Sequence, residues 1–395
     1  MPHYTYLVIG GGMTADAAIR GIREVDPKGS VGLIGAEPHP PYNRPPLSKK
    51  LWLGKPLESI WRKTETLDIS LHLGRTVQAL DLSQKRATDD QGNAYTFDKL
   101  LLATGGTPRR FPFGGDDILY FRTLDDYHKL RTLSDEKQRF AVIGGGFIGS
   151  EIAAALALNG KEVVMMFPEE GIGARVFPHD LSQFLNQHYR EKGVEILPGH
   201  LVTNLKRQNG KLALSVRDAQ TGAEKTILAD GVVAGIGIEP NTALARDAGL
   251  PTDNGIVVDE LLRAGHPDIY AAGDVANFYN PALAARIRVE HEDNALTMGR
   301  HAGRNMAGEA NPYHHLPYFY SDLFELGYEA VGKVDSRLDT TSDWSDPYRQ
   351  GVIYYWQDRR VRGVLLWNVW EKVQAARDLI AEPGPFVPED VKGRL

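Results

Sequence analysis

The hydrophobic pattern of the chain contains one arrangement twice: an apolar run, a glycine-rich turn, and an alanine-rich stretch with helical spacing. The first copy begins at Tyr6–Ile9 and the second at Phe140–Ile143. A further apolar run follows each copy, at residues 31–35 and 162–167. Strands that alternate with helical segments in this way predict parallel sheets of α/β units. The chain is therefore expected to contain two such units, related as a diverged internal repeat.

Later apolar runs predict where each of the two units ends. The runs at 100–108 and 234–241 each end in a turn, and a strand at 269–274 precedes a helical segment at 290–307. Beyond residue 317, runs at 351–356 and 360–367 and a helical stretch at 371–380 predict a small α+β domain. Residues 339–347 are expected to form a polar loop, and the last dozen residues an extended tail. The expected domains are 1–111 with 236–317, 112–235, and 318–395.

Both glycine turns have the spacing that binds the pyrophosphate of a dinucleotide. The first glycine makes the tight turn, the second lets backbone N–H groups approach the anion, and the third small residue lets helix and strand pack closely. These positions are Gly10, Gly12 and Ala15 in the first copy, and Gly144, Gly146 and Gly149 in the second. Two such motifs in one chain predict two Rossmann-like domains and two bound dinucleotides.

An acidic residue follows each glycine turn at the distance expected for binding an adenosine ribose. Glu37 follows the first turn, and Glu169 with Glu170 follows the second. Carboxylates at the second position would repel a 2′-phosphate, so NADH is expected rather than NADPH. Arg175 is the residue that argues for NADPH, and a merely exposed glutamate is the alternative reading of Glu37.

Composition excludes several classes of chemistry. The 395 residues include no cysteine, which excludes disulfides, thiolate metal sites, a cysteine nucleophile and a flavin–dithiol relay. No spacing typical of a metal site is present, and a net charge of −6 gives no support for nucleic-acid binding. No export signal and no apolar run near the length of a membrane span is visible, so a cytoplasmic location is expected.

Several short motifs show a family resemblance. The turns Thr104–Gly106 and Gly273–Asp274, together with both glycine motifs, resemble those of flavin-dependent pyridine-nucleotide oxidoreductases over essentially the whole chain. The run Arg44 to Lys49 (Arg-Pro-Pro-Leu-Ser-Lys) is similar to a signature shared by apoptosis-inducing factor and by bacterial ferredoxin and rubredoxin reductases. The resemblance implies a glutathione-reductase-type fold, FAD in the discontinuous domain and NAD(P)H in the inserted one.

The C-terminal part is more similar to apoptosis-inducing factor. Residues 288–293, 321–323, 327–332 and 364–368 carry this likeness. Tyr320 stands where that family usually has tryptophan, the long insertion of the mammalian C-terminal domain is absent, and no mitochondrial targeting segment is visible. These departures favour a bacterial-type homologue.

The resemblance also implies roles for individual residues. Lys49 would lie near flavin N5 and pair with Glu151, which would steer the nicotinamide carboxamide; the alternative is an exposed lysine and an ordinary first-turn glutamate. His291 would contact flavin and nicotinamide, or else its polar groups would be satisfied within the protein core. Asp274 would accept hydrogen bonds from the ribityl chain, or cap a helix, or both. Phe147 would cover the flavin, or pack between helix and sheet.

The remaining expected cofactor contacts divide into two groups. Around FAD they are Met13, Thr14, Arg44, Val77, Ala103, Thr104, Gly105, Arg109, Glu290 and Glu292, and Gly237 is expected to contact a cofactor that the sequence does not specify. Around the nicotinamide and the flavin ring they are Ile148, Tyr320, Glu329 and Asn368, of which the last three could equally have packing roles.

Two functions remain open at this point. The first is hydride transfer from nicotinamide C4 to flavin N5, after which electrons leave the flavin directly for ferredoxin, rubredoxin, a quinone or a similar acceptor. Arg109, Arg110, Arg286 and Arg288 are candidates for docking an acidic carrier. The second is an NADH-responsive binding protein, in which a long-lived flavin–NAD⁺ charge-transfer complex changes partner contacts or homodimerisation.

Overall fold

The computed structural model describes residues 1–395, and the chain separates into two units that are each assembled from distant segments. The first unit comprises Met1–Asn43, Glu58–Thr107 and Glu239–Phe319. The second comprises Arg44–Leu57, Pro108–Ile238 and Tyr320–Leu395. The short strands β7 (Gly106–Pro108) and β16 (Ile238–Pro240) lie where the chain passes between units. Each unit is described on its own below.

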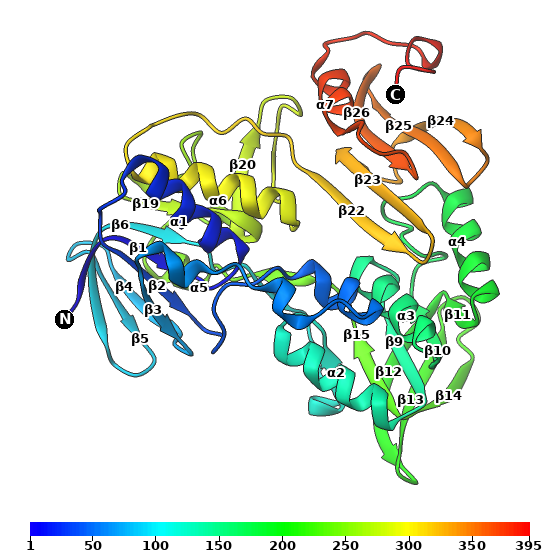
Figure 1. Cartoon of the computed structure of the whole chain (residues 1–395). Helices are drawn as coiled ribbons and strands as arrows, with labels where there is room; N and C mark the ends of the chain where they lie inside the picture. Colours follow the sequence, from blue (N-terminus) through cyan, green and yellow to red (C-terminus); the bar gives the residue numbers. More distant parts are fainter. The chain divides into compact units, whose positions relative to one another are not determined.

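A largely parallel sheet forms the centre of the first unit (Figure 1). Its strand order is β18-β19-β6-β1-β2-β3, and only β18 runs antiparallel to its neighbour. The strands are β1 (His3–Ile9), β2 (Val31–Gly35), β3 (Ser70–Leu73), β6 (Ala94–Leu102), β18 (Arg263–His266) and β19 (Ile269–Ala271). The antiparallel β4 (Val77–Asp81) and β5 (Arg86–Asp89) continue from β6. A smaller sheet has the order β17 (Ile256–Val257), β20 (Ala276–Asn280), β21 (Ala285–Ile287), and α5 (Ala243–Asp247) completes the unit.

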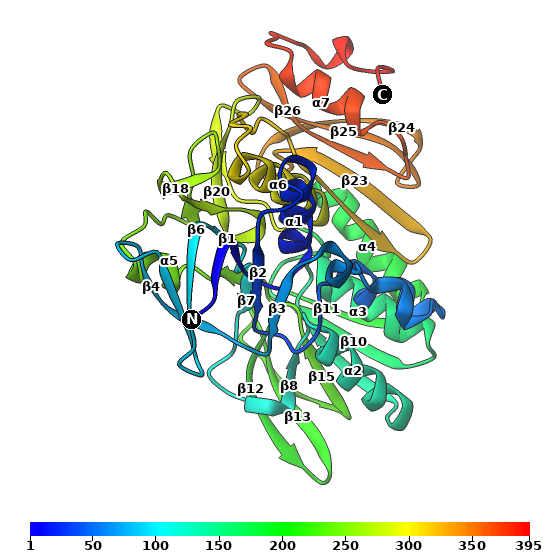
Figure 2. The same ribbon diagram turned by 60° about the vertical axis from the view of Figure 1, so that its left-hand side comes forward.

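Helices α1 (Met13–Val25) and α6 (Glu292–Met306) lie side by side in this unit, as Figures 1 and 2 both show. Glycines make their contact unusually close. A Cβ atom on Gly21 would collide with the carbonyl of Arg300, and one on Gly303 with the carbonyl of Ala18. The two backbones therefore touch, and a segment near residue 300 completes the domain that the N-terminus begins.

The second unit contains another parallel sheet, with the order β11-β10-β9-β15-β8. Its strands are β8 (Ile118–Tyr120), β9 (Arg139–Ile143), β10 (Glu162–Phe167), β11 (Val194–Pro198) and β15 (Gly231–Ala234). Its helices are α2 (Leu124–Glu136), α3 (Phe147–Leu158) and α4 (His179–Glu191). An antiparallel sheet of β12 (His200–Gln208), β13 (Lys211–Asp218) and β14 (Glu224–Ala229) is inserted before β15.

The C-terminal part of this unit is a five-stranded antiparallel sheet with one helix. Its order is β22 (Tyr318–Leu323), β23 (Leu326–Gly332), β26 (Arg360–Trp367), β25 (Gln350–Gln357) and β24 (Asp339–Asp346). Helix α7 (Val373–Ala381) packs on β23 and β26. The sequence predicts this mixed α/β fold with a small α+β C-terminal domain, which the structure shows to be mostly β-sheet.

One local prediction is wrong: residues 339–346 form the strand β24, not a loop. This strand is at the edge of its sheet, paired only with β25, and all of its residues are wholly or partly exposed. An exposed edge strand has little need for apolar residues, so its polar sequence resembles that of a loop. The C-terminal tail also differs slightly from the expectation, because it contains a short 3₁₀ turn, Pro388–Asp390, followed by the buried Val391. No helix is both long enough and apolar enough to cross a bilayer.

Candidate functional site

The first glycine turn forms an open cradle at the start of a helix. Strand β1 ends at Ile9 and α1 begins at Met13, with Gly12 at the N-cap position and no side chain capping the helix. A Cβ atom on Gly12 would meet nothing within 4 Å, whereas one on Gly10 would collide with the carbonyl of Ala103. Uncapped N–H groups facing open space suit a pyrophosphate. The residues around this turn are buried: Met13, Thr14, Ala15 and Ala103. Thr104 and Gly105 follow Ala103 in the chain.

The second glycine turn repeats this geometry in the second unit. Helix α3 begins at Phe147 with Gly146 at the N-cap and no capping side chain. A Cβ atom on Gly146 would meet nothing within 4 Å, whereas one on Gly149 would overlap the carbonyl oxygen of Gly144. Gly146 therefore borders the space for an anion, and Gly149 serves the close packing of helix on strand. The residues present fit two dinucleotides.

The acidic residues after the two turns are held by neighbours. Glu37 Oε2 accepts a 2.6 Å hydrogen bond from the hydroxyl of Tyr42. Glu169 Oε1 accepts one of 2.9 Å from Nε of Arg175, whose side chain is otherwise exposed. Arg175 thus pairs with the carboxylate that was expected to repel a 2′-phosphate.

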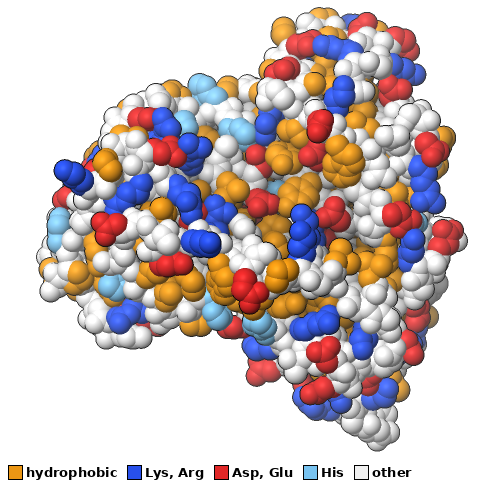
Figure 3. Space-filling model, viewed as in Figure 1, with side chains coloured by type: hydrophobic (Ala, Val, Ile, Leu, Met, Phe, Trp, Pro, Cys, Tyr) orange, Lys and Arg blue, Asp and Glu red, His pale blue; other side chains and the backbone are white.

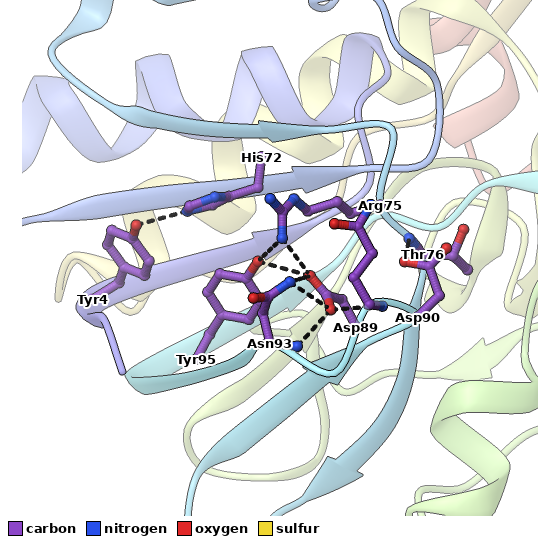
Figure 4. A network of polar contacts seen from close by, with 9 residues as sticks. Tyr4, His72, Arg75, Thr76, Asp89, Asp90, Asn93 and Tyr95 are labelled. Atoms are coloured by element: carbon purple, nitrogen blue, oxygen red, sulfur yellow. Dashed lines mark hydrogen bonds and ion pairs between the residues drawn. The ribbon is translucent and has the colours of Figure 1, made fainter.

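A buried network shapes the segment that leads to Val77 (Figure 4). Asp89 is fully buried and accepts hydrogen bonds from Tyr95 at 2.8 Å, Arg75 at 3.1 Å and Asn93 at 3.0 and 3.1 Å. Burial alone would raise the pKa of Asp89, but these bonds hold it well below its usual range. The segment is also tied to the residue expected to bind the ribose, since the N–H of residue 74 donates to the carbonyl of Glu37.

His72 extends this network toward β1. Its Nε2 lies 2.8 Å from the hydroxyl of Tyr4, and its ring packs 4.8 Å from that of Tyr95. Burial, and secondarily the nearby charge of Arg75, lowers the pKa of His72. A neutral imidazole therefore joins β1, β3 and β6 at this edge of the sheet.

The second unit brings Lys49 and Glu151 together, as the resemblance implies. Lys49 Nζ lies 3.2 Å from Glu151 Oε1, and both side chains are less than one-tenth exposed. Lys49 follows the 3₁₀ turn Pro45–Ser48, which packs on α3 (Figure 1). Glu151 is in the first turns of α3, directly after the second glycine motif. The sequence thus places a buried ion pair beside the expected nicotinamide site.

Two serine hydroxyls hold the Glu151 carboxylate. Ser48 Oγ donates to Oε2 at 2.6 Å, and Ser321 Oγ donates to Oε1 at 2.5 Å. Tyr320 lies with its ring 4.1 Å from Lys49 Nζ, and Asp322 lies 3.9 Å from the same atom. The sequence analysis missed both serines as site residues, although each stands beside a residue it selected, Lys49 or Tyr320.

In the first unit, Asp274 and the start of α6 are joined by one arginine. Asp274 lies in the 3₁₀ turn Gly273–Val275, and His291 is the N-cap residue of α6. Arg288 is mostly buried and donates to the carbonyl of Asp274 at 3.0 Å, while pairing with Glu290 at 2.6 Å. Glu292 is the first residue of the helix. This arrangement fixes the expected ribityl and flavin-ring contacts relative to each other.

Arg286 and Arg288 are therefore engaged within their own unit. Arg286 Nη1 donates to the carbonyls of Val258 and Asn277. On the face shown in Figure 3, basic side chains are interspersed with acidic ones. Of the arginines considered for docking a carrier, Arg288 is mostly buried, and Arg110 stacks 4.8 Å from the ring of Tyr120.

Other predicted residues lie near the second glycine turn or at the edge of its unit. Phe147 and Ile148, at the start of α3, are each more than one-third exposed. Phe147 tilts against Tyr328 at 6.5 Å. Arg44 donates to the carbonyl of Arg122, and Gly237, with φ at +88°, accepts from the N–H of Arg109.

Glu329 and Asn368 are not joined to the Lys49–Glu151 pair by any recorded contact. Glu329 follows Tyr328 on β23, so its side chain is on the opposite face of that strand. Burial raises the pKa of Glu329, and its Oε2 has no hydrogen-bond partner. Asn368 accepts a hydrogen bond from the N–H of Gly327 at 2.7 Å and donates to the carbonyl of Arg349 at 2.8 Å.

Comparison with known proteins agrees with this geometry. Residues 4–299 match the family described as pyridine nucleotide-disulphide oxidoreductase. The chain belongs to this family. Residues 302–347 and 341–382 match the C-terminal domain of mitochondrion-associated apoptosis-inducing factor. The predicted resemblance is thereby confirmed, and the protein is a pyridine-nucleotide flavoprotein oxidoreductase whose cofactors are FAD and NAD(H).

Individual relatives fall in both branches that the motifs indicate. Mitochondrial apoptosis-inducing factor 1 of Dictyostelium discoideum is 35% identical over 95% of this chain and 78% of that protein. Putidaredoxin reductase of Pseudomonas putida is 30% identical over 97% of this chain and 93% of that protein. The structure of a covalent putidaredoxin reductase–putidaredoxin complex superimposes with a TM-score of 0.90 and 29% identity, covering 99% of this chain and 96% of that one.

Proposed function

We propose that this protein oxidises NADH and passes the electrons directly from its flavin to a small iron–sulfur protein of the ferredoxin type. The observation that carries the proposal is the buried Lys49–Glu151 pair at the glycine turn of the second unit, in a chain without cysteine. When bound, the flavin accepts a hydride from the nicotinamide.

The side chains of this protein would then orient the two cofactors and exclude water, and would not react themselves. Gly144, Gly146 and the N-terminus of α3 would hold the pyrophosphate of NADH, and Glu169 its adenosine ribose. Glu151 would orient the nicotinamide carboxamide, and Lys49 would place positive charge beside the flavin. Phe147 would cover the reacting face from water until the nicotinamide enters.

The corresponding FAD contacts would come from the first unit. Gly10, Gly12 and Ala15 would hold its pyrophosphate, Glu37 its ribose, and Asp274 its ribityl chain. The N-terminus of α6, with His291 at its cap, would stabilise negative charge on the reduced ring. No proton transfer by a side chain is required for this half of the reaction.

The similar proteins provide the most support for the second half of the proposed reaction, the transfer of electrons from the flavin to the acceptor. Without cysteine, no dithiol can relay electrons from the flavin. A ferredoxin–NAD⁺ reductase component of Photorhabdus laumondii is 31% identical over 98% of this chain. Together with the putidaredoxin reductase likeness, this supports a ferredoxin-type acceptor over a quinone, with Arg109 and Arg110 as candidate contacts.

The test is an anaerobic titration of the FAD-loaded protein with NADH, followed by addition of an oxidised [2Fe–2S] ferredoxin. We expect the flavin band to bleach with NADH and to return in proportion to the ferredoxin added. A flavin that NADH bleaches but ferredoxin leaves reduced would contradict the proposed acceptor. A flavin that NADH does not bleach would contradict the reductase function itself.

A second candidate function rests on the match of the C-terminal domain to apoptosis-inducing factor. In this case NADH would leave a reduced flavin–NAD⁺ complex that persists in air and changes self-association. The same titration distinguishes it, because a long-wavelength band would outlast admission of air. Light scattering with and without NADH would then report dimerisation.

A further inference from the structure

Three consecutive residues of β22, Tyr320 to Asp322, contact the Lys49–Glu151 pair. The ring of Tyr320 lies 4.1 Å from Lys49 Nζ, and Asp322 lies 3.9 Å from the same atom. Ser321, between them, donates to Glu151 at 2.5 Å. Side chains alternate along a strand, so residues 320 and 322 share one side and Ser321 takes the other. One strand of the C-terminal sheet therefore holds both members of the pair.

The contact of Ser321 is placed to control orientation. Ser321 is fully buried and Glu151 is 6% exposed, so water does not compete for this hydrogen bond. Ser48 holds Oε2 from the opposite segment, while Ser321 and Lys49 share Oε1. A carboxylate held at both oxygens by groups from different segments has its plane fixed, whereas one held at a single oxygen can rotate.

The hydroxyl of Ser321 is itself fixed by a neighbour. Tyr328, on the adjacent strand β23, forms a side-chain hydrogen bond with Ser321, and its ring stacks on Trp367 at 5.9 Å. Burial raises the pKa of Tyr328 well above its usual value, so its hydroxyl stays protonated. Because a carboxylate can only accept, the single proton of Ser321 is donated to Glu151, and the chain of contacts runs from the C-terminal core to the ion pair.

We propose that Ser321 is a positioning residue, through which the C-terminal domain fixes Glu151 and so sets the rate at which NADH reduces the flavin. The proposal rests on the function proposed above and deepens it. Ser321 touches neither reacting atom; it acts only through the carboxylate. A shift of β22 relative to α3 would slow the reaction without altering either glycine cradle.

The experiment is a double-mutant cycle on the FAD-loaded protein. Ser321→Ala, Glu151→Ala and the double variant are compared in two measurements: the anaerobic rate of flavin reduction at saturating NADH, and the dissociation constant of NAD⁺ by calorimetry. Ser182→Ala is the matched control, because Ser182 is equally buried in the same unit but donates to the carbonyl of Ile172.

In the Ser321→Ala variant we expect NADH to reduce the flavin about tenfold more slowly than in the wild type, since one charge-assisted hydrogen bond to Glu151 is lost while those from Ser48 and Lys49 remain. NAD⁺ binding should weaken about threefold by the same reasoning. In the Glu151→Ala background the same substitution should change either quantity by less than about twofold, because residues that act as one unit are not additive. Ser182→Ala should leave both quantities unchanged.

Two results would overturn the proposal: a Ser321→Ala variant with the wild-type rate, or effects of Ser321→Ala and Glu151→Ala that multiply. If Ser321→Ala does not fold, Ser321→Cys replaces it, because a thiol is a weak donor of similar shape and the chain has no other cysteine. Its rate should then lie below wild type, and a wild-type rate would refute the role. If NADH fails to bleach even the wild-type flavin, the proposed function is wrong, whereas the NAD⁺ binding cycle still tests Ser321.

Discussion

The two glycines of the second turn should respond in opposite ways to the same substitution. The backbone at Gly146 has φ at −84°, which alanine adopts without strain, and the added methyl would meet no atom within 4 Å. We expect Gly146→Ala to leave the free energy of unfolding unchanged or to raise it by up to about 1 kcal/mol, because alanine restricts the unfolded chain. The methyl would instead occupy the space expected for the pyrophosphate of NADH.

The effect on binding can be worked from the same geometry. Displacing the pyrophosphate costs at least one hydrogen bond from a helix N–H to a charged oxygen, worth about 1.5–3 kcal/mol. The dissociation constant of NADH should therefore rise roughly tenfold to a hundredfold. It can be measured anaerobically from how the rate of flavin reduction saturates with NADH, and FAD content should not change.

Gly149→Ala is the matched control in the same turn. Its methyl would overlap the carbonyl oxygen of Gly144, a backbone atom that cannot move aside. We expect it to lower the free energy of unfolding by about 2 kcal/mol or more in urea denaturation. A Gly146→Ala variant that binds NADH as wild type does, or a Gly149→Ala variant of wild-type stability, would refute the assignment of these two roles.

Three further substitutions test other parts of the site. Glu151→Gln keeps the shape of the side chain but removes a charge 3.2 Å from Lys49, a gross Coulomb interaction of about 5 kcal/mol at an effective dielectric constant of about 20. The rate at which NADH reduces the flavin, measured by stopped flow, should fall about a hundredfold while FAD is retained. A change under about threefold would contradict the role of the pair. Glu169→Ala frees Arg175 for a 2′-phosphate, so the ratio of kcat/KM for NADH over NADPH should fall at least about tenfold, and an unchanged ratio would place ribose recognition elsewhere. Asp89→Asn should cost about 3 kcal/mol near neutral pH. The pKa of Asp89 is lowered in the folded state, so its carboxylate stabilises the fold above the ordinary pKa of an aspartate, and this stabilisation is lost as the pH falls below that pKa. The free energy of unfolding of the variant, measured by urea denaturation, should therefore depend less on pH between about 5 and 3 than that of the wild type. An equal pH dependence would refute this account.

Much of the architecture could be predicted because local pattern and global fold agree in it. The apolar runs at 31–35 and 162–167 coincide with β2 and β10, and the helical segment near 290–307 with α6. Parallel strands buried on both faces must be apolar throughout, which makes them easy to recognise. The edge strand β24 could not be recognised, because its contacts are to solvent on most positions.

The site was predictable only where a residue carries charge or lies in a glycine turn. Lys49 and Glu151 are 102 positions apart, and family resemblance rather than periodicity joined them. Ser48 and Ser321 were missed because a serine hydroxyl is common and gains meaning only from the carboxylate that tertiary structure brings to it. The pairing of Arg175 with Glu169 likewise depends on how the loop after β10 folds back.

The backbone contact between α1 and α6 has a consequence for the order in which the protein is made. Residues 18 and 21 meet residues 300 and 303, so the first domain that synthesis begins is among the last that it can finish. The second parallel sheet is complete once residue 234 has been added, well before α6 exists. During translation the sheet that is expected to bind NAD(H) can therefore fold first, before the glycine-lined face of α1 can pack on α6. Capture of FAD, whose expected contacts include residues of both α1 and α6, would then be a late event, after α6 has been made.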